Sequence, residues 1–344
     1  MSAALSLLGK LPGLTSIEAL IESRFASDAP LITEISAYLL TLGGKRIRPM
    51  LAILCGQLCG LKAPFENTRE GKQLIDIAAG IELIHMATLL HDDIIDRSPL
   101  RRHKASPLVV FGSENTLLAG DFLLTRAFGL CARLDRYVIE RTEEACVALT
   151  EGEILEVSLV KQVHTLESSL TIAKKKTAAL FRLAGETASH IASTSELTTK
   201  YLGDFGEQLG IAFQILDDIL DVTSTEDVLG KKSGQDLRER KPSIVNVLWL
   251  ASENPMADRL RTPAVSSSDA SAAEIAAEEA WVAESLKELG ASSVILEARS
   301  LAEKYVAGAE EALVAAEANS ATPFEKGSRK VLRGLMDYVL ERVK

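Results

Sequence analysis

Apolar side chains recur at helical spacing along almost the whole chain. In segment 30–42, PLITEISAYLLTL, the positions that would share one helical face are Leu31, Ile32, Ile35, Leu39 and Leu40. The pair Gly43-Gly44 that follows is typical of a helix C-terminus. Alternation of the kind that indicates strands does not persist beyond a few residues. The pattern therefore predicts an all-α fold.

Three longer segments have apolar residues nearly all round the predicted helix. The first is 72–96, KQLIDIAAGIELIHMATLLHDDIID, and the others are 169–192 and 201–221. Helices of this kind are buried on every side, so we expect them at the centre of the fold. Segment 252–272, SENPMADRLRTPAVSSSDASA, predicts a surface loop or insertion. Because amphipathic helices follow it and need a surface to pack on, we expect 1–344 to be a single domain.

Composition narrows the class of protein. The chain has 38 Lys and Arg against 48 Asp and Glu, a net charge of −10, which argues against a general nucleic-acid binder. Cys55, Cys59, Cys131 and Cys146 lack His or Cys partners at zinc spacing, so we expect reduced core residues. The N-terminus has no basic region followed by a sustained apolar stretch, and no uninterrupted apolar run approaches the ~20 residues of a membrane span. We expect a cytoplasmic protein.

The stretch HDDIIDRSPLRR, at 91–102, places acidic residues beside basic residues at the end of a predicted apolar helix. Asp92 and Asp96 are four residues apart and share one helical face, while Asp93 points about 100° away. Like charges at this spacing repel each other, and a hard cation such as Mg²⁺ would remove that cost. The alternative is a solvated helix end with surface ion pairs.

A second motif, QILDDILD, repeats this spacing with Asp217, Asp218 and Asp221. It also lies in an apolar helix, where unpaired carboxylates are costly to bury, so we expect both motifs to line a common cavity and bind metal. The basic residues gathered in short runs are Lys45, Arg46, Arg48, Arg101, Arg102, Lys174–Lys176, Lys231, Lys232, Arg238, Arg240 and Lys241. Any one run is more often plain surface, but acids and cations together indicate a phosphate site with Mg²⁺. The chain lacks the glycine-rich loops of nucleotide-binding folds.

Five motifs in order carry a specific resemblance. They are GGKRIRP, LLHDDIIDRSPLRR, KKKTAALF, GIAFQILDDILD and GKKSGQDLRERK. With them the chain resembles the trans-isoprenyl diphosphate synthases, or polyprenyl synthetase family, from about residue 15 to the C-terminus. The resemblance implies the isoprenoid synthase fold, an antiparallel helical bundle around a deep central cavity, in a homodimer. It also implies head-to-tail condensation of isopentenyl diphosphate with geranyl, farnesyl or geranylgeranyl diphosphate.

The resemblance assigns roles motif by motif. The Mg²⁺ ligands would be Asp92, Asp93, Asp96, Asp217, Asp218 and Asp221, holding roughly three ions bridged by substrate diphosphate. Isopentenyl diphosphate would be bound by Lys45, Arg48, His85 and Arg102. The allylic diphosphate would be bound by Arg101, Lys176, Thr177, Gln214, Lys231 and Lys241. Of these, Lys176, Thr177, Gln214 and Lys231 would act in catalysis.

A few positions weaken or modify the resemblance. A lone histidine in a buried helix is more often a core residue, but His85 lies about two turns before Asp92 on the same face, which favours the site. His103 and Arg240 stand where the family often has Gly, and Ser243 where it usually has Thr. These departures concern the closing of loops and remove no metal ligand.

Small residues precede the first aspartate motif. An aromatic side chain at Ala87 or Thr88 would form a high floor in the cavity and stop the product early, as in short-chain family members. Ala87 is small, so by resemblance we expect a medium- or long-chain product, such as hexaprenyl to decaprenyl diphosphate for a quinone side chain. If Phe122 or Phe128 limits the cavity instead, the product would be short, such as farnesyl or geranylgeranyl diphosphate.

Three rival functions remain at this point. A class I terpene cyclase would share the first aspartate motif but would lack GGKRIRP, because it binds no second diphosphate. A non-catalytic subunit of a heteromeric synthase would tend to lose aspartates or basic ligands. A structural helical bundle would have no reason to bury acids.

Overall fold

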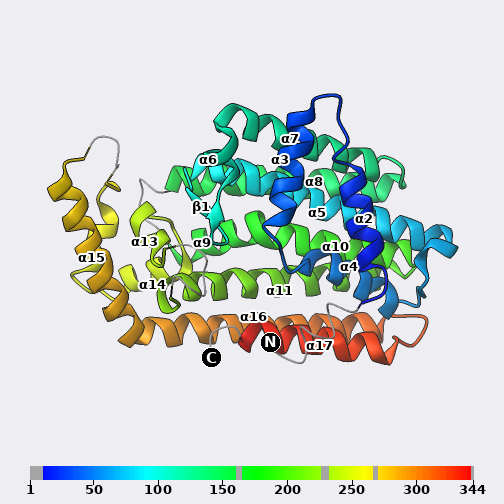
Figure 1. Cartoon of the computed structure of the whole chain (residues 1–344). Helices are drawn as coiled ribbons and strands as arrows, with labels where there is room; N and C mark the ends of the chain where they lie inside the picture. Colours follow the sequence, from blue (N-terminus) through cyan, green and yellow to red (C-terminus); the bar gives the residue numbers. More distant parts are fainter. Residues whose placement is uncertain (1–10, 160–164, 226–231, 266–269, 342–344) are drawn as a thin grey trace. The chain divides into compact units, whose positions relative to one another are not determined.

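The computed structural model describes residues 11–159, 165–225, 232–265 and 270–341. Nearly all regular structure in this part of the chain is helical, which confirms the all-α prediction (Figure 1). The chain forms two compact units, and each is built from three segments. Unit 1 comprises Met1–Cys146, Leu180–Glu207 and Ala309–Tyr338, and unit 2 comprises Val147–Ala179, Gln208–Gly308 and Val339–Lys344. A single domain over 1–344 stays a prediction.

The central helix of unit 1 is α5, Arg69–Ile95, which begins where the Thr68 side chain accepts a hydrogen bond from the Gly71 amide. It packs against α7, Ser113–Cys131, and against α4, Ile47–Leu58, and α2, Leu14–Ser23. By length and composition α5 could cross a membrane, yet 72% of its most apolar window is buried within the protein. Its apolar surface is thus satisfied by neighbouring helices, as the sequence predicts for a core helix.

A small hairpin in unit 1 was not expected from the sequence. Strand β1, Leu100–Arg101, pairs antiparallel with β2, Lys104–Ala105. Arg102 and His103 form the turn with φ of 51° and 66°, the left-handed conformation that favours glycine. Two-residue strands are too short to show alternation, so periodicity could not reveal them.

The other elements of unit 1 complete the packing around α5. They are α3, Pro30–Thr41, η1, Phe65–Asn67, and α6, Pro107–Phe111. Helices that contribute residues to both units are α8, Arg136–Leu159, α10, Ala179–Ile191, α11, Glu196–Thr223, α16, Ser293–Ala318, and α17, Lys326–Glu341. The four cysteines are free; Cys55 and Cys131 are buried and the other two partly so, which agrees with the predicted core role.

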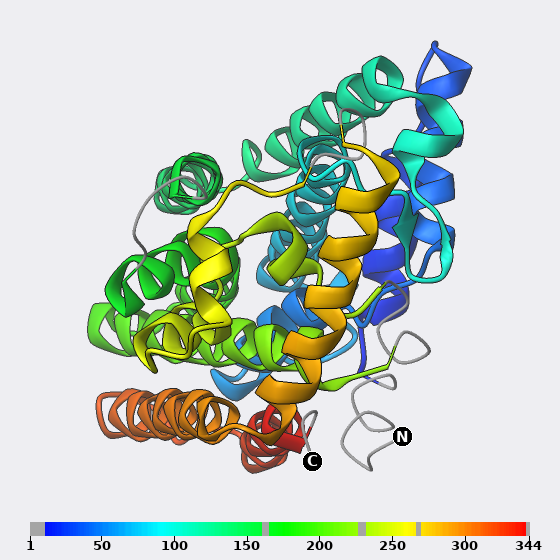
Figure 2. The ribbon, with the colours of Figure 1, turned by 90° about the vertical axis from the view of Figure 1, so that its left-hand side faces the viewer.

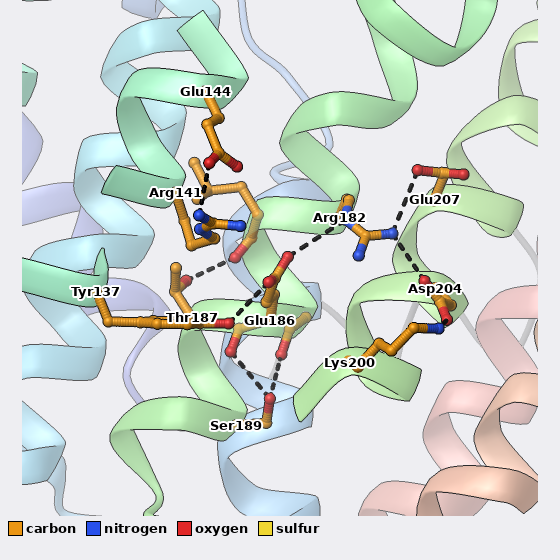
Figure 3. A network of polar contacts seen from close by, with 12 residues as sticks. Tyr137, Arg141, Glu144, Arg182, Glu186, Thr187, Ser189, Lys200, Asp204 and Glu207 are labelled. Carbon is orange, nitrogen blue, oxygen red and sulfur yellow. Dashed lines mark hydrogen bonds and ion pairs between the residues drawn. The ribbon is translucent and has the colours of Figure 1, made fainter. Parts of the chain in front are cut away.

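A polar network joins the unit 1 parts of α8, α10 and α11 (Figure 3). Arg182 donates to Asp204 at 2.7 Å and to Glu207 at 3.3 Å, and its Nε lies 3.3 Å from Glu186. The Tyr137 hydroxyl donates to the same Glu186 at 2.7 Å. Burial and the neighbouring Glu186 carboxylate raise the pKa of Tyr137, so the hydroxyl keeps its proton. The network fixes these three helices by satisfying a buried carboxylate.

The remaining described helices lie wholly in unit 2. They are α9, Leu166–Ile172, the π-helix η2, Ala173–Ala178, α13, Gln235–Glu239, α14, Ile244–Ala251, η3, Ala257–Arg261, and α15, Ala272–Ala291. Figure 2 shows α15 in orange beside the yellow-green segment that carries α13. Segment 252–272, expected to be a surface loop, contains η3 and reaches the start of α15, while 266–269 lie outside the described residues. The Trp281 indole of α15 donates to the Met256 carbonyl at 3.2 Å, which ties this segment down.

Candidate active site

The GGKRIRP motif places its cations at the start of α4 in unit 1. Arg46 is the N-cap residue with φ 51°, and its Nη1 lies 2.9 Å from Oε1 of buried Glu82 on α5. Arg46 is therefore committed to a buried ion pair that fixes the motif against α5. The sequence shows three cations here with nothing to tell them apart, so this structural role was missed.

Gly44 allows two guanidinium groups to approach the same backbone. A Cβ at Gly44 would lie 2.7 Å from Nη1 of Arg46 and 3.1 Å from Nη1 of Arg102, so a larger residue would displace these guanidinium groups. Its φ of 154° is also a conformation that side chains disfavour. Arg102 Nη1 in turn donates to the Gly43 carbonyl, which ties the β1–β2 hairpin to the loop before α4.

The predicted isopentenyl diphosphate residues Arg48, His85 and Arg102 share one positive field. Burial lowers the pKa of His85 well below its ordinary value, and the charges of Arg48, Arg102, Arg101 and Arg46 lower it further. Burial and repulsion from Arg101 and Arg46 also lower the pKa of Arg102. Glu82 balances the charge of Arg46 and Asp93 that of Arg101, and a bound anion would further stabilise the group of cations. The arrangement suits a diphosphate, with neutral His85 available as a hydrogen-bonding group.

The two remaining cations of the first motif lie against aromatic rings. Lys45 Nζ is 5.4 Å from the centre of the Tyr338 ring, and Arg48 Cζ is 5.1 Å from the centre of the Phe181 ring. Rings at this distance stabilise a cation and limit the directions its side chain takes. Periodicity gave no sign of these partners, because Phe181 and Tyr338 come from distant helices.

The first aspartate motif forms the last turns of α5. Asp93 is fully buried and pairs with Arg101 in a fork, at 2.6 Å from Nη2 and 2.9 Å from Nε to Oδ1. Burial raises the pKa of Asp93 in spite of Arg101. Asp92 and Asp96, by contrast, are partly exposed on their shared face. Asp93 is thus paired with Arg101, and its role among the Mg²⁺ ligands stays a prediction.

The donor chemistry of Asp92 and Asp96 fits Mg²⁺. Carboxylate oxygens with access to solvent are the ligands this ion prefers, and it commonly completes its shell with water and substrate phosphate. Within the described ranges, no three His, Cys, Asp or Glu side chains converge as a ready-made metal site. A site that needs substrate oxygens to be complete agrees with that arrangement.

In unit 2 a chain of hydrogen bonds joins three predicted site residues. The Thr177 hydroxyl donates to Oε1 of Gln214 at 2.6 Å, and Nε2 of Gln214 donates to Oδ1 of Asp218 at 2.8 Å. The Ile244 amide donates to Oδ2 of Asp218 at 2.7 Å. Burial raises the pKa of Asp218 to about 7, although both bonds oppose the shift. Both oxygens of Asp218 have protein partners, whereas Asp217 is partly exposed.

Thr177 and Lys176 lie on the π-helix η2. Such turns are rare overall but concentrate at functional sites, and local periodicity does not reveal this one. A Cβ at Gly152 would lie 2.9 Å from the Lys176 amide, so α8 can come this close only with glycine there. The Lys176 ammonium pairs with Glu153 at 2.6 Å and with Glu156. These two glutamates were not predicted as partners.

The third aspartate of the second motif caps α13. Oδ2 of Asp221 accepts a hydrogen bond from the Asp236 amide at 3.0 Å. The backbone carbonyl of Asp221 accepts another from the Gly234 amide at 2.7 Å. The Lys241 amide donates to the Asp236 carbonyl at 2.9 Å, and its ammonium pairs with Glu239 at 3.1 Å. The segment that carries Lys241 is thereby fixed to the motif. Predicted site residue Lys231 lies outside the described residues.

The predicted floor residues lie in α5 between His85 and Asp92. Ala87 is buried, and Thr88 is partly buried with its hydroxyl donating to the His85 carbonyl at 2.8 Å. Of the alternative floor residues, Phe128 is 42% exposed, which does not suit a wall inside a cavity. Phe122 is partly buried, and the guanidinium of Arg126 lies 4.8 Å from the centre of its ring.

Comparison with known proteins identifies a family that this chain matches. Residues 29–280 match the model of the polyprenyl synthetase family. The octaprenyl diphosphate synthase of Haemophilus influenzae is 38% identical over 235 residues, which span 68% of this chain and 69% of that protein. A solved decaprenyl diphosphate synthase from Rhodobacter capsulatus superposes with a TM-score of 0.80 at 31% identity, covering 99% of this chain and 98% of that one. A polyprenyl synthase from Caulobacter crescentus, complexed with calcium and isoprenyl diphosphate, gives 0.80 at 29% identity, covering 96% and 95%.

Proposed function

Because the chain belongs to the polyprenyl synthetase family, it is a prenyltransferase, and we propose that it condenses isopentenyl diphosphate with an allylic diphosphate. The observation that carries the proposal is the positive field that Arg48 and Arg102 create around His85, apart from the Arg101–Asp93 pair. A family member that binds only one diphosphate would not need this second anion site. The same observation argues against a terpene cyclase.

The product is a medium- or long-chain all-trans polyprenyl diphosphate. Relatives at 38% identity over two thirds of the chain and 31% over nearly all of it carry the names octaprenyl and decaprenyl diphosphate synthase. The small side chain of Ala87 agrees with a product that extends past this point of α5. We place the enzyme in the cytoplasm, with its lipophilic product serving as a quinone side chain.

The reaction begins when the allylic C–O bond breaks to give a delocalised carbocation and diphosphate. Mg²⁺ held by both aspartate motifs, in roughly three ions, would neutralise the charge of the departing diphosphate. The double bond of isopentenyl diphosphate then attacks the carbocation, and a proton leaves to the released diphosphate. No side chain needs to act as a nucleophile, in keeping with a site built of cations, acids and amides.

The chain's own residues divide this work. Arg48, Arg102 and neutral His85 hold isopentenyl diphosphate, and Lys45 joins them. Arg101, Lys176, Lys231 and Lys241 hold the allylic diphosphate. The Thr177 proton is directed to Gln214, which leaves the lone pairs of the Thr177 oxygen to stabilise positive charge.

We also propose a homodimer that uses the outer face of α7. Leu117, Leu118 and Phe128 are each more than 40% exposed on this helix, more apolar surface than one helix face usually leaves to water. A second copy of the chain would cover it. Sedimentation of the purified protein should give the mass of a dimer, and Leu118→Glu should shift it toward the monomer.

The function is tested with purified protein, Mg²⁺, farnesyl diphosphate and radiolabelled isopentenyl diphosphate, with the products sized after phosphatase treatment. A ladder that ends at hexaprenyl or longer supports the proposal. A ladder that ends at farnesyl or geranylgeranyl length keeps the reaction and makes the enzyme a short-chain synthase. Folded protein that incorporates no label from any allylic primer would be a non-catalytic subunit.

A further inference from the structure

Arg240 combines two unusual features in unit 2. It is 1% exposed, so its charge is removed from water, and its φ of 58° is a conformation that side chains disfavour. Glycine would adopt this conformation without strain. An arginine here therefore needs partners that hold both its charge and its backbone.

Those partners come from α15 and from segment 252–262. Nη1 of Arg240 lies 2.7 Å from Oε1 of Glu278, and its guanidinium carbon lies 4.6 Å from the centre of the Trp281 ring. Its Nε donates to the Thr262 carbonyl at 3.3 Å. Arg259, whose side chain is partly exposed, pairs with the same Glu278 at 2.8 Å, so that two arginines, one glutamate and one tryptophan form a clamp.

The segment that Arg240 anchors supplies two hydrogen-bond donors to the second aspartate motif. It carries the Asp236 amide that binds Asp221 and the Ile244 amide that binds Asp218. A second link to α15 is the pair between Arg238 and Glu279 at 2.8 Å. If the anchor is lost, both donors and Lys241 become free to move away from the motif.

We propose that Arg240 is a positioning residue for the second aspartate motif, held by Glu278, with which Arg259 also pairs. The inference rests on the proposed function, since the motif and Lys241 acquire their roles only there. It also gives segment 252–262 a purpose: its Arg259 and its Thr262 carbonyl hold the anchor in place.

Arg240→Gly is the decisive variant, because glycine keeps the backbone conformation and removes only the anchor. We expect the apparent KM for the allylic diphosphate and the half-saturating Mg²⁺ concentration to rise about tenfold, the size typical of loosened supporting groups around a metal. The KM for isopentenyl diphosphate should stay unchanged, since its proposed ligands lie in unit 1. Arg240→Lys should restore part of the loss by keeping a charge beside Glu278.

A second measurement does not depend on activity. Backbone amide exchange in peptides covering 234–246 should be about tenfold faster in Arg240→Gly than in the wild type. Arg299→Met, which removes a surface pair with Glu303 on α16, is the matched control and should change neither exchange nor kinetics.

The outcomes separate the two proposals. Unchanged exchange in Arg240→Gly, or equal rises in both KM values, overturns the positioning role. If Arg240→Gly exchanges faster but the wild type makes no prenyl product, the anchoring role of Arg240 stands and the proposed function is rejected.

Discussion

The Thr177 hydroxyl donates a 2.6 Å hydrogen bond to the side-chain oxygen of Gln214, which turns the Gln214 amide nitrogen toward Asp218. The direction of this bond leaves the Thr177 oxygen as an acceptor only. An oxygen fixed in this way can stabilise a carbocation from the start of the reaction, because no reorientation is required.

Thr177→Val removes the hydroxyl at almost constant volume. We expect kcat to fall about ten- to hundredfold with little change in either KM, because the lost interaction is made with developing charge. Thr177→Ser should recover most of the rate. Thr171→Val is the control, since the exposed Thr171 hydroxyl bonds to the Glu167 carbonyl of its own helix. A rate loss in the control as large as in Thr177→Val would assign the effect to the helix rather than to the hydroxyl.

Asp93 and Arg101 form a buried pair whose members depend on each other. Arg101→Met leaves the fully buried Asp93 carboxylate without its fork, and we expect a loss of about 3 kcal/mol in the free energy of unfolding. The double variant Arg101→Met with Asp93→Asn should recover a large part of this loss, because no unpaired charge remains. Urea unfolding of the wild type, both single variants and the double variant measures the coupling. Strict additivity of the two single losses would mean that the pair does not interact.

His85 makes the stability of the protein depend on pH. The pKa of His85 in the folded state lies below the ordinary value of 6.5. Below about pH 6.5, the unfolded chain therefore binds a proton at His85 that the folded chain does not bind. The free energy of unfolding keeps its full value above about pH 6.5 and decreases below it, by at most about 1.4 kcal/mol per pH unit for one proton.

His85→Gln removes this titration. Between pH 7.5 and pH 5.5, the wild type should lose more unfolding free energy than the variant, as measured by urea unfolding at each pH. Parallel pH profiles for the two proteins would show that His85 titrates normally in the folded state.

Patterning predicted the helices and the two aspartate motifs well, since both depend on local spacing. It could not distinguish Arg46 from Arg48, because only the folded chain shows Arg46 beside buried Glu82. His103 and Arg240 were noticed as departures from glycine, but only the structure shows their left-handed backbone. Partners such as Glu153 for Lys176 come from another helix and leave no mark on local sequence.

Ala87 offers the last test, on the length of the product. Its buried place on α5 between His85 and Asp92 means that Ala87→Phe would put an aromatic ring where the growing chain is expected to pass. We expect the product ladder of Ala87→Phe to stop several units earlier, with the first condensation still running. Overpacking of a buried position costs about 1–3 kcal/mol, so thermal unfolding must show that the variant remains folded under assay conditions.

Phe122→Ala tests the rival floor in the same assay. If Ala87 lines the path of the growing chain, Phe122→Ala should give the wild-type ladder. Phe122 belongs to α7, not α5, and its ring lies against the Arg126 guanidinium of the same helix. A longer product from Phe122→Ala, together with an unchanged ladder from Ala87→Phe, would move the floor of the cavity to α7. That result would separate chain length from the residues just before the first aspartate motif while leaving the condensation itself intact.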